Sequence, residues 1–146
     1  MKQPLLFIVA LLVVQAPGCH SHKPAGMPKL YPCNIKIVDK SGEIVENASV
    51  TATNPDSKWA SIGLTGPDGI AEMKTNGMYP GVPLGTYKVL VTKYDITVTV
   101  KSNNPEVSDT IRETLVFDKS FSDESTTPLE MTIEAKKSND VSFEVF

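Results

Sequence analysis

The sequence predicts an all-β protein, an antiparallel β-sandwich of about seven to eight strands. From residue 30 onward, apolar residues recur at every second position, which is the period of a strand with one buried face, and a helical period of 3.6 is hardly present. Turn residues (Gly, Pro, Asn and Asp) divide this pattern into short segments, as in β-sandwiches. Thr, Lys or Glu fill the alternate positions, so we expect the outer faces of the sheets to contact water.

The first half of the domain is predicted to hold four strands. Cys33, Ile35 and Ile37 share the inward face of the first, and "KWASIGLT" is read as a strand that carries Trp59. The segments "DKSGE", "NPDS" and "GPDG" are read as turns, since the Asp68-Gly69 pair suits positive φ. The expected strands are 33–38, 48–54, 58–65 and 70–75.

The second half repeats the pattern, with one polar interruption. Pro83 cannot donate to a sheet, so it belongs just before a strand in which Tyr87 turns its ring inward and keeps its hydroxyl at the edge, similar to a corner tyrosine. Residues 101–128 are polar and are read as a long excursion with one short strand or helix over 111–117. The expected sandwich strands are 86–93, 96–100, 129–135 and 141–146, with Ile96, Val98, Val100 and then Val141, Phe143, Val145 on apolar faces.

The N-terminus is predicted to be a lipoprotein signal peptide. Lys2 precedes an unbroken apolar run from Leu5 to Val14, which is shorter than the roughly 20 residues of a spanning helix. The run ends in "QAPGC", which resembles the lipobox of bacterial lipoproteins: Gly18 and Cys19 fit, whereas Ala16 and Pro17 depart from the usual residues. The alternative is an ordinary secretory signal followed by an unrelated cysteine.

The lipobox resemblance divides the chain into a signal peptide (1–18), a lipidated Cys19 with a flexible tether (19–29) and a β-domain (30–146). It implies a membrane partner through the lipid. Residue 20 is His and not the Asp that marks inner-membrane retention, so the resemblance favours the outer membrane. A lipidated Cys19 has no thiol left, which leaves Cys33 unpaired; we expect a buried small hydrophobe, with a reactive thiol as the alternative.

Three segments resemble known domains in their order and spacing. "DKSGEIVENASVTATN", "TGPDGIAEMKT" and "PLGTYKVLVTK" resemble the carboxypeptidase regulatory-like and transthyretin-like (prealbumin-like) domains, with departures at Glu46-Asn47 and Pro67. Over residues 27–146 the chain resembles small bacterial envelope lipoproteins of this class. The resemblance implies a prealbumin-like or Ig-like sandwich used as an appended module that rarely carries catalytic residues.

The composition argues against several function classes. Basic residues number 14 and lie scattered, so no stripe exists for nucleic acid. His20 and His22 are the two histidines, and neither a G-x-S-x-G nor a P-loop motif occurs. We therefore expect no enzyme, no cofactor and no metal. Weaker alternatives are a metal clip at "CHSH", calcium at "SDESTTP" with Asp118 and Asp123, and an acidic pair for glycoside hydrolysis among Glu72, Glu130, Glu134 and Glu144.

Two functions from different classes remain open. The first is a structural or protein-interaction module that presents loops or edge strands to an envelope protein. The second is a glycan- or small-ligand-binding module with Tyr79, Trp59 and Tyr94 as contact residues. Tyr79 in "NGMYPGVP" is expected in an exposed loop, whereas a tryptophan such as Trp59 is more often a core residue.

Overall fold

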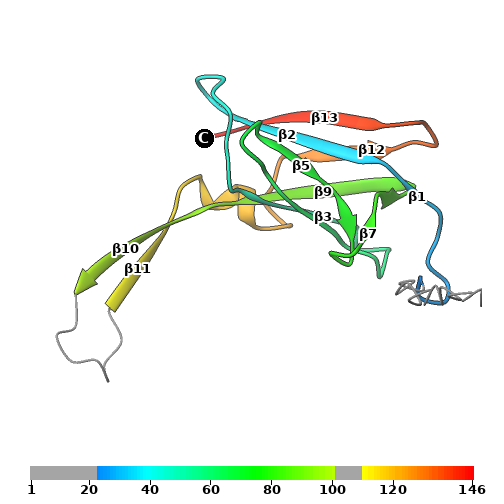
Figure 1. Ribbon diagram of the computed structural model, residues 1–146, viewed down its shortest axis with the longest axis horizontal. Helices are drawn as coiled ribbons and strands as arrows, with labels where there is room; N and C mark the ends of the chain where they lie inside the picture. The colour runs from blue at the N-terminus through cyan, green and yellow to red at the C-terminus, as the bar shows by residue number, and fades with distance from the viewer. Residues whose placement is uncertain (1–22, 101–109) are drawn as a thin grey trace, which may run out of the picture.

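The computed structural model describes residues 23–100 and 110–146, and within them the protein is all-β apart from one short 3₁₀ turn. Two sheets lie over one another with a shared apolar core (Figure 1). The signal peptide, Cys19 and the two histidines lie outside the described residues, so the predictions about them stay predictions.

The larger sheet has six strands and the smaller has three. The order in the larger sheet is β12 (Glu130–Ile133), β9 (Gly85–Thr92), β3 (Ser49–Thr53), β4 (Ser61–Leu64), β6 (Lys74–Thr75) and β7 (Tyr79–Pro80). The smaller sheet is β13 (Asn139–Val145), β2 (Cys33–Asp39) and β5 (Ile70–Glu72). Two further pairs are β1 (Leu30–Tyr31) with β8 (Val82–Pro83), and β10 (Tyr94–Val100) with β11 (Thr110–Leu115); η1 (Lys119–Ser122) follows β11.

One strand pair contradicts the antiparallel prediction. β13 runs parallel to β2, from Asn139 beside Cys33 to Val145 beside Asp39. The alternation of apolar residues fixes which face of a strand is buried and says nothing of its direction. The strand before β13 is β12, which lies in the six-stranded sheet. The chain then crosses to the three-stranded sheet, where β13 runs beside β2 in the same direction. The named pairs within the six-stranded sheet are antiparallel, as expected.

The core lies between the two sheets and confirms most of the predicted inward faces. Ile35 and Ile37 of β2 are fully buried, as are Val89 and Val91 of β9. Val141 and Phe143 are half-buried and pack against this core, and the rest of the buried cluster is contributed by Cys33, Val45, Ala48, Val50, Ala52, Ala71, Met73, Val82, Tyr87, Phe121, Leu129, Met131, Ile133 and Val145.

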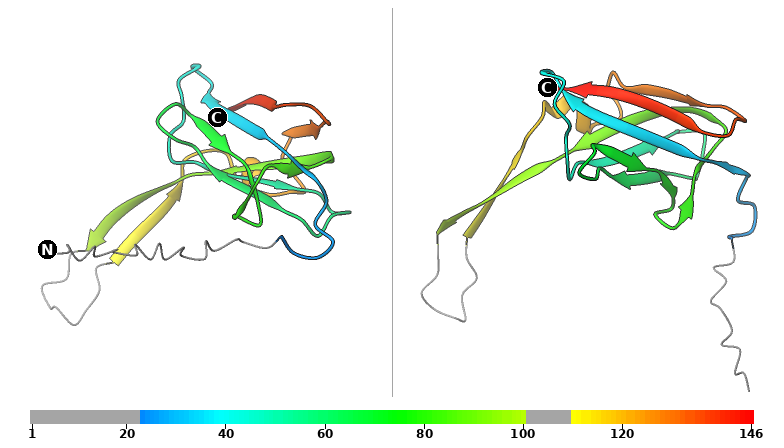
Figure 2. Two further views of the ribbon diagram at one scale, coloured as in Figure 1. Left: turned by 45° about the vertical axis from the view of Figure 1, so that its right-hand side comes forward. Right: turned by 45° about the horizontal axis from the view of Figure 1, so that its top comes forward.

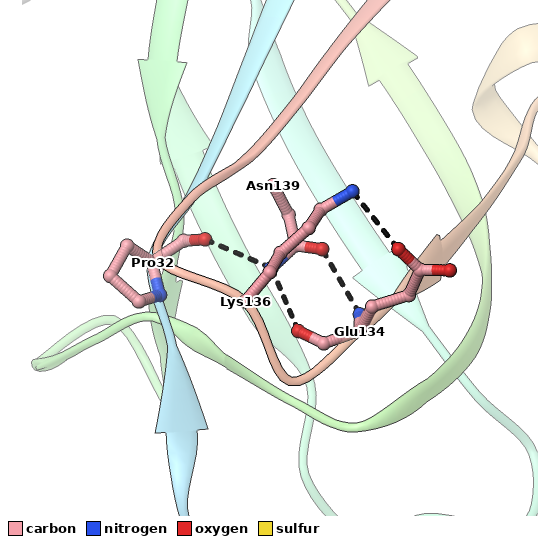
Figure 3. Close-up of polar contacts among 4 residues, drawn as sticks. All are labelled: Pro32, Glu134, Lys136 and Asn139. Atoms are coloured by element: carbon pink, nitrogen blue, oxygen red, sulfur yellow. Dashed lines mark hydrogen bonds and ion pairs between the residues drawn. The ribbon is translucent and has the colours of Figure 1, made fainter.

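Two hydrogen-bonded side chains fasten the ends of this core. The Tyr87 hydroxyl donates to the Pro83 carbonyl at 3.1 Å, which confirms the corner tyrosine. Asn139, 1% exposed, closes the turn between β12 and β13 (Figure 3). Its Oδ1 accepts from the Glu134 amide at 3.0 Å, and its Nδ2 donates to the carbonyls of Glu134 (3.2 Å) and Pro32 (3.3 Å). The start of β2 is thereby tied to the start of β13.

A hairpin projects from the sandwich at the point where β9 ends. β10 follows β9 after Lys93, and β11 pairs with it from Tyr94 beside Leu115 to Val98 beside Ile111. This hairpin, called the arm below, extends away from both sheets in all views (Figures 1 and 2). Of the strand or helix expected over 111–117, the structure has a strand, β11, whereas the expectation that 96–100 belongs to the sandwich is wrong.

Candidate functional site

The arm carries an apolar face that no other element of the described residues covers. Directly opposed residues of an antiparallel pair project on the same side of the ribbon. The opposed pairs Tyr94–Leu115, Ile96–Glu113 and Val98–Ile111 therefore share one face. Four of these side chains are more than half exposed: Tyr94 (54%), Ile96 (65%), Val98 (51%) and Ile111 (54%). We call these six residues the apolar face of the arm.

The opposite side of the arm is polar, which makes the ribbon amphipathic. It presents Asp95 beside Thr114 and Thr97 beside Arg112. A two-stranded hairpin is marginally stable in water unless one face packs against something. An exposed apolar patch rimmed by polar residues is typical of an interaction site. The arm is thus the first candidate contact surface.

A second candidate is an open trough of about 600 Å³ on the outside of the sandwich, where β4 meets β5. Gly63 belongs to its lining, and a Cβ at Gly63 would point toward the core, where it would lie 3.0 Å from the Ala71 Cβ and from the Glu72 carbonyl oxygen. The two sheets approach one another closely at this point. We call this hollow the β4–β5 trough; it is lined by Ser49, Ile62, Gly63, Leu64, Gly66, Asp68, Ile70, Glu72, Lys74 and Gly77.

The β4–β5 trough combines apolar walls with a charged rim. Ile62 is 44% exposed and Leu64 is 62% exposed on the β4 side. Lys74 is exposed on the β6 side and has no ion-pair partner within the described residues, where the pairs are Lys88–Glu130 and Lys136–Glu134. The lining also holds the carboxylates of Asp68 and Glu72, so the rim carries one positive and two negative charges.

Two of the four edge strands of the sandwich, β12 and β13, are less suited to a partner. β12 carries Glu130, which lies 3.2 Å from Lys88 across the strand pair. β13 carries Asp140 and the exposed Glu144, and the Asp140 carboxylate accepts hydrogen bonds from Asn34 and Ser138 at 2.9 Å each. Charged side chains on an edge strand discourage the addition of another strand. The uncharged edge that strand addition favours is therefore absent from β12 and β13.

The three aromatic residues proposed as ligand contacts occupy different settings. Tyr79 is only 7% exposed, so the expectation that it is exposed is wrong. The turn at Asn76 and Gly77, both with positive φ, returns the chain so that Tyr79 pairs with Thr75 while Met78 (65% exposed) points outward.

Trp59 and Tyr94 are the other two. Trp59 lies in the loop before β4, outside the strand predicted for it, and is half-buried with the Lys58 ammonium 5.0 Å from its ring centre. Tyr94 lies on the apolar face of the arm. The structure thus places one of the three residues in a candidate surface.

Residues of both surfaces lie in segments for which the sequence predicts sandwich strands. Ile96 and Val98 alternate with threonines, which is the pattern of such a strand. Ile62 and Leu64 lie in the segment read as a strand around Trp59. The polar stretch that follows residue 100 is the signal that could have marked 94–115 as a projecting hairpin.

The remaining reactive groups are engaged in the fold. Cys33 is 3% exposed, which confirms the predicted burial, and burial together with the nearby Asp140 charge raises the pKa of its thiol to about 11. Asp118 caps η1 through the Ser120 amide, and Asp123 accepts from the amide and hydroxyl of Ser125; these hydrogen bonds lower the pKa of both carboxyls. Over 23–100 and 110–146, no three His, Cys, Asp or Glu side chains are grouped to hold a metal.

Comparisons with known proteins give a partial likeness of fold. No protein-family model matches the sequence, and no curated protein is similar to it. The crystal structure of BcpA*(D312A), the major pilin subunit of Bacillus cereus, matches with a TM-score of 0.46 and 13% identity over 82% of this chain. A 9R-lipoxygenase from Cyanothece PCC8801 matches with a TM-score of 0.41 and 10% identity over 86% of this chain.

This chain spans only a part of either protein, 30% of the pilin subunit and 18% of the lipoxygenase. Both TM-scores lie below 0.5 and both identities below 25%, so neither protein's role extends to this chain. In the part of the chain that the structure describes, no helix is long and apolar enough to cross a bilayer.

Proposed function

We propose that this protein is a non-catalytic interaction module of the cell envelope, anchored by lipid on Cys19, which contacts another protein through its arm. The observation that carries the proposal is the apolar face of the arm, where Ile96, Val98 and Ile111 are each more than half exposed. A two-stranded hairpin is only marginally stable in water, and contact of these apolar side chains with water is unfavourable. A bound partner that covers them would remove this apolar surface from water and stabilise the arm.

The absence of catalysis is part of the proposal and rests on the chemistry of the chain. After His22 the sequence contains no histidine, which is the commonest general base. The raised pKa of Cys33 keeps its thiol protonated at neutral pH, and a protonated thiol is a poor nucleophile. The carboxylates that could form an acidic pair (Glu72, Glu130, Glu134 and Glu144) are all exposed.

The lipid anchor is proposed from the sequence "QAPGC" and has its own test. Replacing Cys19 (Cys19→Ala) should abolish labelling by a radioactive fatty acid and release the protein from membranes. Density-gradient fractionation of the unchanged protein should place it with the outer membrane, as the resemblance at His20 suggests. Membrane retention of the unlabelled variant would mean that the apolar segment itself is the anchor.

The interaction proposal is tested by pull-down from detergent-solubilised membranes. The unchanged protein should recover a stoichiometric protein partner, and the double variant Ile96→Ser with Val98→Ser should lose most of it. The matched control is Thr97→Ser with Thr114→Ser, which changes the polar face of the same arm and should keep the partner. Recovery that is equal for all three proteins would contradict a role for the apolar face.

Binding of a glycan or small ligand is the weaker alternative. Stacking on a sugar needs exposed aromatic faces, but Tyr79 is buried and the Lys58 ammonium lies over the Trp59 ring. Tyr94 remains as an exposed ring, and it belongs to the arm. Glycan-array binding that is lost in Trp59→Ala and kept in the arm double variant would favour this alternative.

A further inference from the structure

The arm has an open edge along β10 that carries little charge. In the part of the chain that the structure describes, β10 pairs with β11 on one side and with no strand on the other. The regular part of this edge runs from Tyr94 to Val98, before the bulge between Val98 and Val100, and Asp95 is its one charged residue. An exposed, uncharged edge strand is a template for a strand of another molecule.

We propose that β10 of one copy pairs antiparallel with β10 of a second copy, so that two arms join into one four-stranded sheet. This inference goes beyond the proposed function, because it concerns the edge of the arm, whereas the proposed function concerns the apolar face.

The backbone groups that face the open edge follow from the pairing with β11. The Val116 amide donates to the Lys93 carbonyl at 2.9 Å, which makes Lys93 and Val116 a hydrogen-bonded pair. Hydrogen-bonded and non-hydrogen-bonded pairs alternate along an antiparallel ladder. The N–H and C=O groups of Tyr94, Ile96 and Val98 therefore point away from β11. These groups are the donors and acceptors that an added strand needs.

The side chains of β10 match those of a second β10 about a two-fold axis at Ile96. In this register Ile96 opposes Ile96 of the second copy, and Tyr94 opposes Val98 of the second copy. Aromatic and β-branched residues form favourable cross-strand pairs. Asp95 opposes Thr97, so no like charges meet. The pairing also joins the residues whose backbone groups face the edge, and the apolar faces of both arms lie on one side of the new sheet.

The other edge of the arm is less suited to the same pairing. β11 carries Arg112 and Glu113 at its centre. A two-fold axis at either residue would oppose that residue to its own copy, and like charges directly opposite one another are destabilising. Self-pairing is therefore assigned to β10.

The edges of the sandwich near β5 and β7 offer fewer free backbone groups. β7 has two residues, and one of them is Pro80, which has no N–H to donate. In β5 the Ile70 carbonyl accepts from the Gly66 amide at 3.0 Å, and the Ile70 amide donates to the Asp68 carboxylate at 3.0 Å. The groups that β5 turns away from β2 at Ile70 are thus already bonded within the chain.

A second copy also supplies what a lone hairpin lacks. Two strands are marginally stable in water, and three or more strands with an apolar face are needed for independent stability. Each arm extends away from its own sheets (Figures 1 and 2), and antiparallel pairing places the two sandwiches at opposite ends of the joined arms. The joined arms would present an apolar face twice as wide to an envelope partner.

The test is disulfide formation between copies that carry single cysteines on the polar face, which leaves the apolar face unchanged. Asp95 and Thr97 of the second copy would form a non-hydrogen-bonded pair with Cα atoms about 4.5 Å apart, which a disulfide can span. Two Asp95 residues, or two Thr97 residues, would lie about 8 Å apart, because they are offset by two residues along the strands. A disulfide does not bridge Cα atoms more than about 7 Å apart.

The experiment uses the acylated full chain in detergent under mild oxidation. An equal mixture of the Asp95→Cys and Thr97→Cys proteins should give a disulfide-linked dimer, and either protein alone should give about tenfold less. Cys33 does not interfere, since it is 3% exposed. The unchanged protein should sediment as a dimer at high concentration, which checks association without any substitution.

The matched control places cysteines in the same two rows of the arm at its other edge. Thr114 lies beside Asp95, and Arg112 lies beside Thr97. In the joined arms the two β11 strands are outermost, so a mixture of Thr114→Cys and Arg112→Cys should give no dimer. Equal dimer from both mixtures, dimer from neither, or an unchanged protein that stays monomeric overturns the pairing through β10.

The outcomes separate this inference from the proposed function. If no dimer forms but the pull-down recovers a different protein through Ile96 and Val98, the pairing fails and the proposed function stands. If the Asp95–Thr97 dimer forms but no other protein is recovered, the pairing stands and the proposed function fails. If neither is found, both fail.

Discussion

The sandwich and the arm are built from the same sequence pattern and end in opposite environments. In β2, Ile35 and Ile37 alternate with polar residues and are fully buried. In β10, Ile96 and Val98 alternate with threonines and are 65% and 51% exposed. The difference is that β2 lies over a second sheet, whereas β10, among the strands that the structure describes, pairs with β11 alone. Alternation therefore identifies a strand and its apolar face, and the surrounding topology decides whether that face is covered.

The largest effect is expected in the covered core. Ile35→Ala removes a side chain that has no exposed surface, so it leaves a cavity and should lower the free energy of unfolding by about 2–5 kcal/mol. Urea unfolding monitored by circular dichroism measures this change. Ile62→Ala, at a 44% exposed position of the sandwich, is the control and should cost much less. Equal losses at both positions would mean that Ile35 is not the core residue described here.

The next effect concerns a backbone contact within the sandwich. Gly81 has φ of +99°, and a Cβ there would lie 2.7 Å from the Tyr31 carbonyl oxygen. Gly81→Ala should therefore lower the free energy of unfolding by about 1–3 kcal/mol. Gly42→Ala is the matched control, since Gly42 has φ of +83° with no atom within 4 Å of an added Cβ. The excess loss at Gly81 measures the close approach of Gly81 to Tyr31 in β1, and an equal loss would rule it out.

A smaller effect is expected for the corner tyrosine. Tyr87→Phe keeps the buried ring and removes the hydrogen bond to the Pro83 carbonyl. The expected loss is about 0.5–1.5 kcal/mol in the free energy of unfolding, measured by thermal or urea unfolding. Tyr94→Phe in the exposed arm provides the comparison and should change stability little. A larger loss of stability for Tyr94→Phe than for Tyr87→Phe would contradict the description of Tyr87 as a structural hydrogen-bond donor and of Tyr94 as an exposed residue of the arm.

The smallest effect should come from the arm itself. Ile96→Ala removes an exposed side chain, so the stability of the isolated protein should change by less than about 0.5 kcal/mol. The same variant should weaken partner recovery in the pull-down. A loss of stability comparable with that of Ile35→Ala would show that Ile96 packs against the sandwich.

The sequence predicts the covered part of this fold better than its open part. The inward positions of β2, β9, β12 and β13, the turn at Asp68-Gly69 and the Tyr87 corner all follow from local patterns, because each pattern has one stable realisation in a sandwich. The parallel pairing of β13 with β2 could not be predicted, since it depends on where distant strands meet.

The candidate site was harder to predict for the same reason. Exposed Tyr79 was expected from its Gly- and Pro-rich neighbours, but the turn at Asn76-Gly77 directs Met78 outward and buries the ring of Tyr79. The β4–β5 trough forms where Gly63 meets Ala71 across two sheets, which the sequence does not bring together. Of the proposed contacts, only Tyr94 lies on a surface that the structure leaves open.

The most direct test of this account is photo-crosslinking from single positions of the arm in intact cells. A photoreactive amino acid at Ile96 samples the apolar face, and the same residue at Thr97, the next position, samples the polar face. Contact through the apolar face should give a discrete protein adduct from position 96 and little or none of this adduct from position 97. No adduct from position 96, or equal adducts from both positions, would contradict the claim that the apolar face of the arm is where this protein meets its partner.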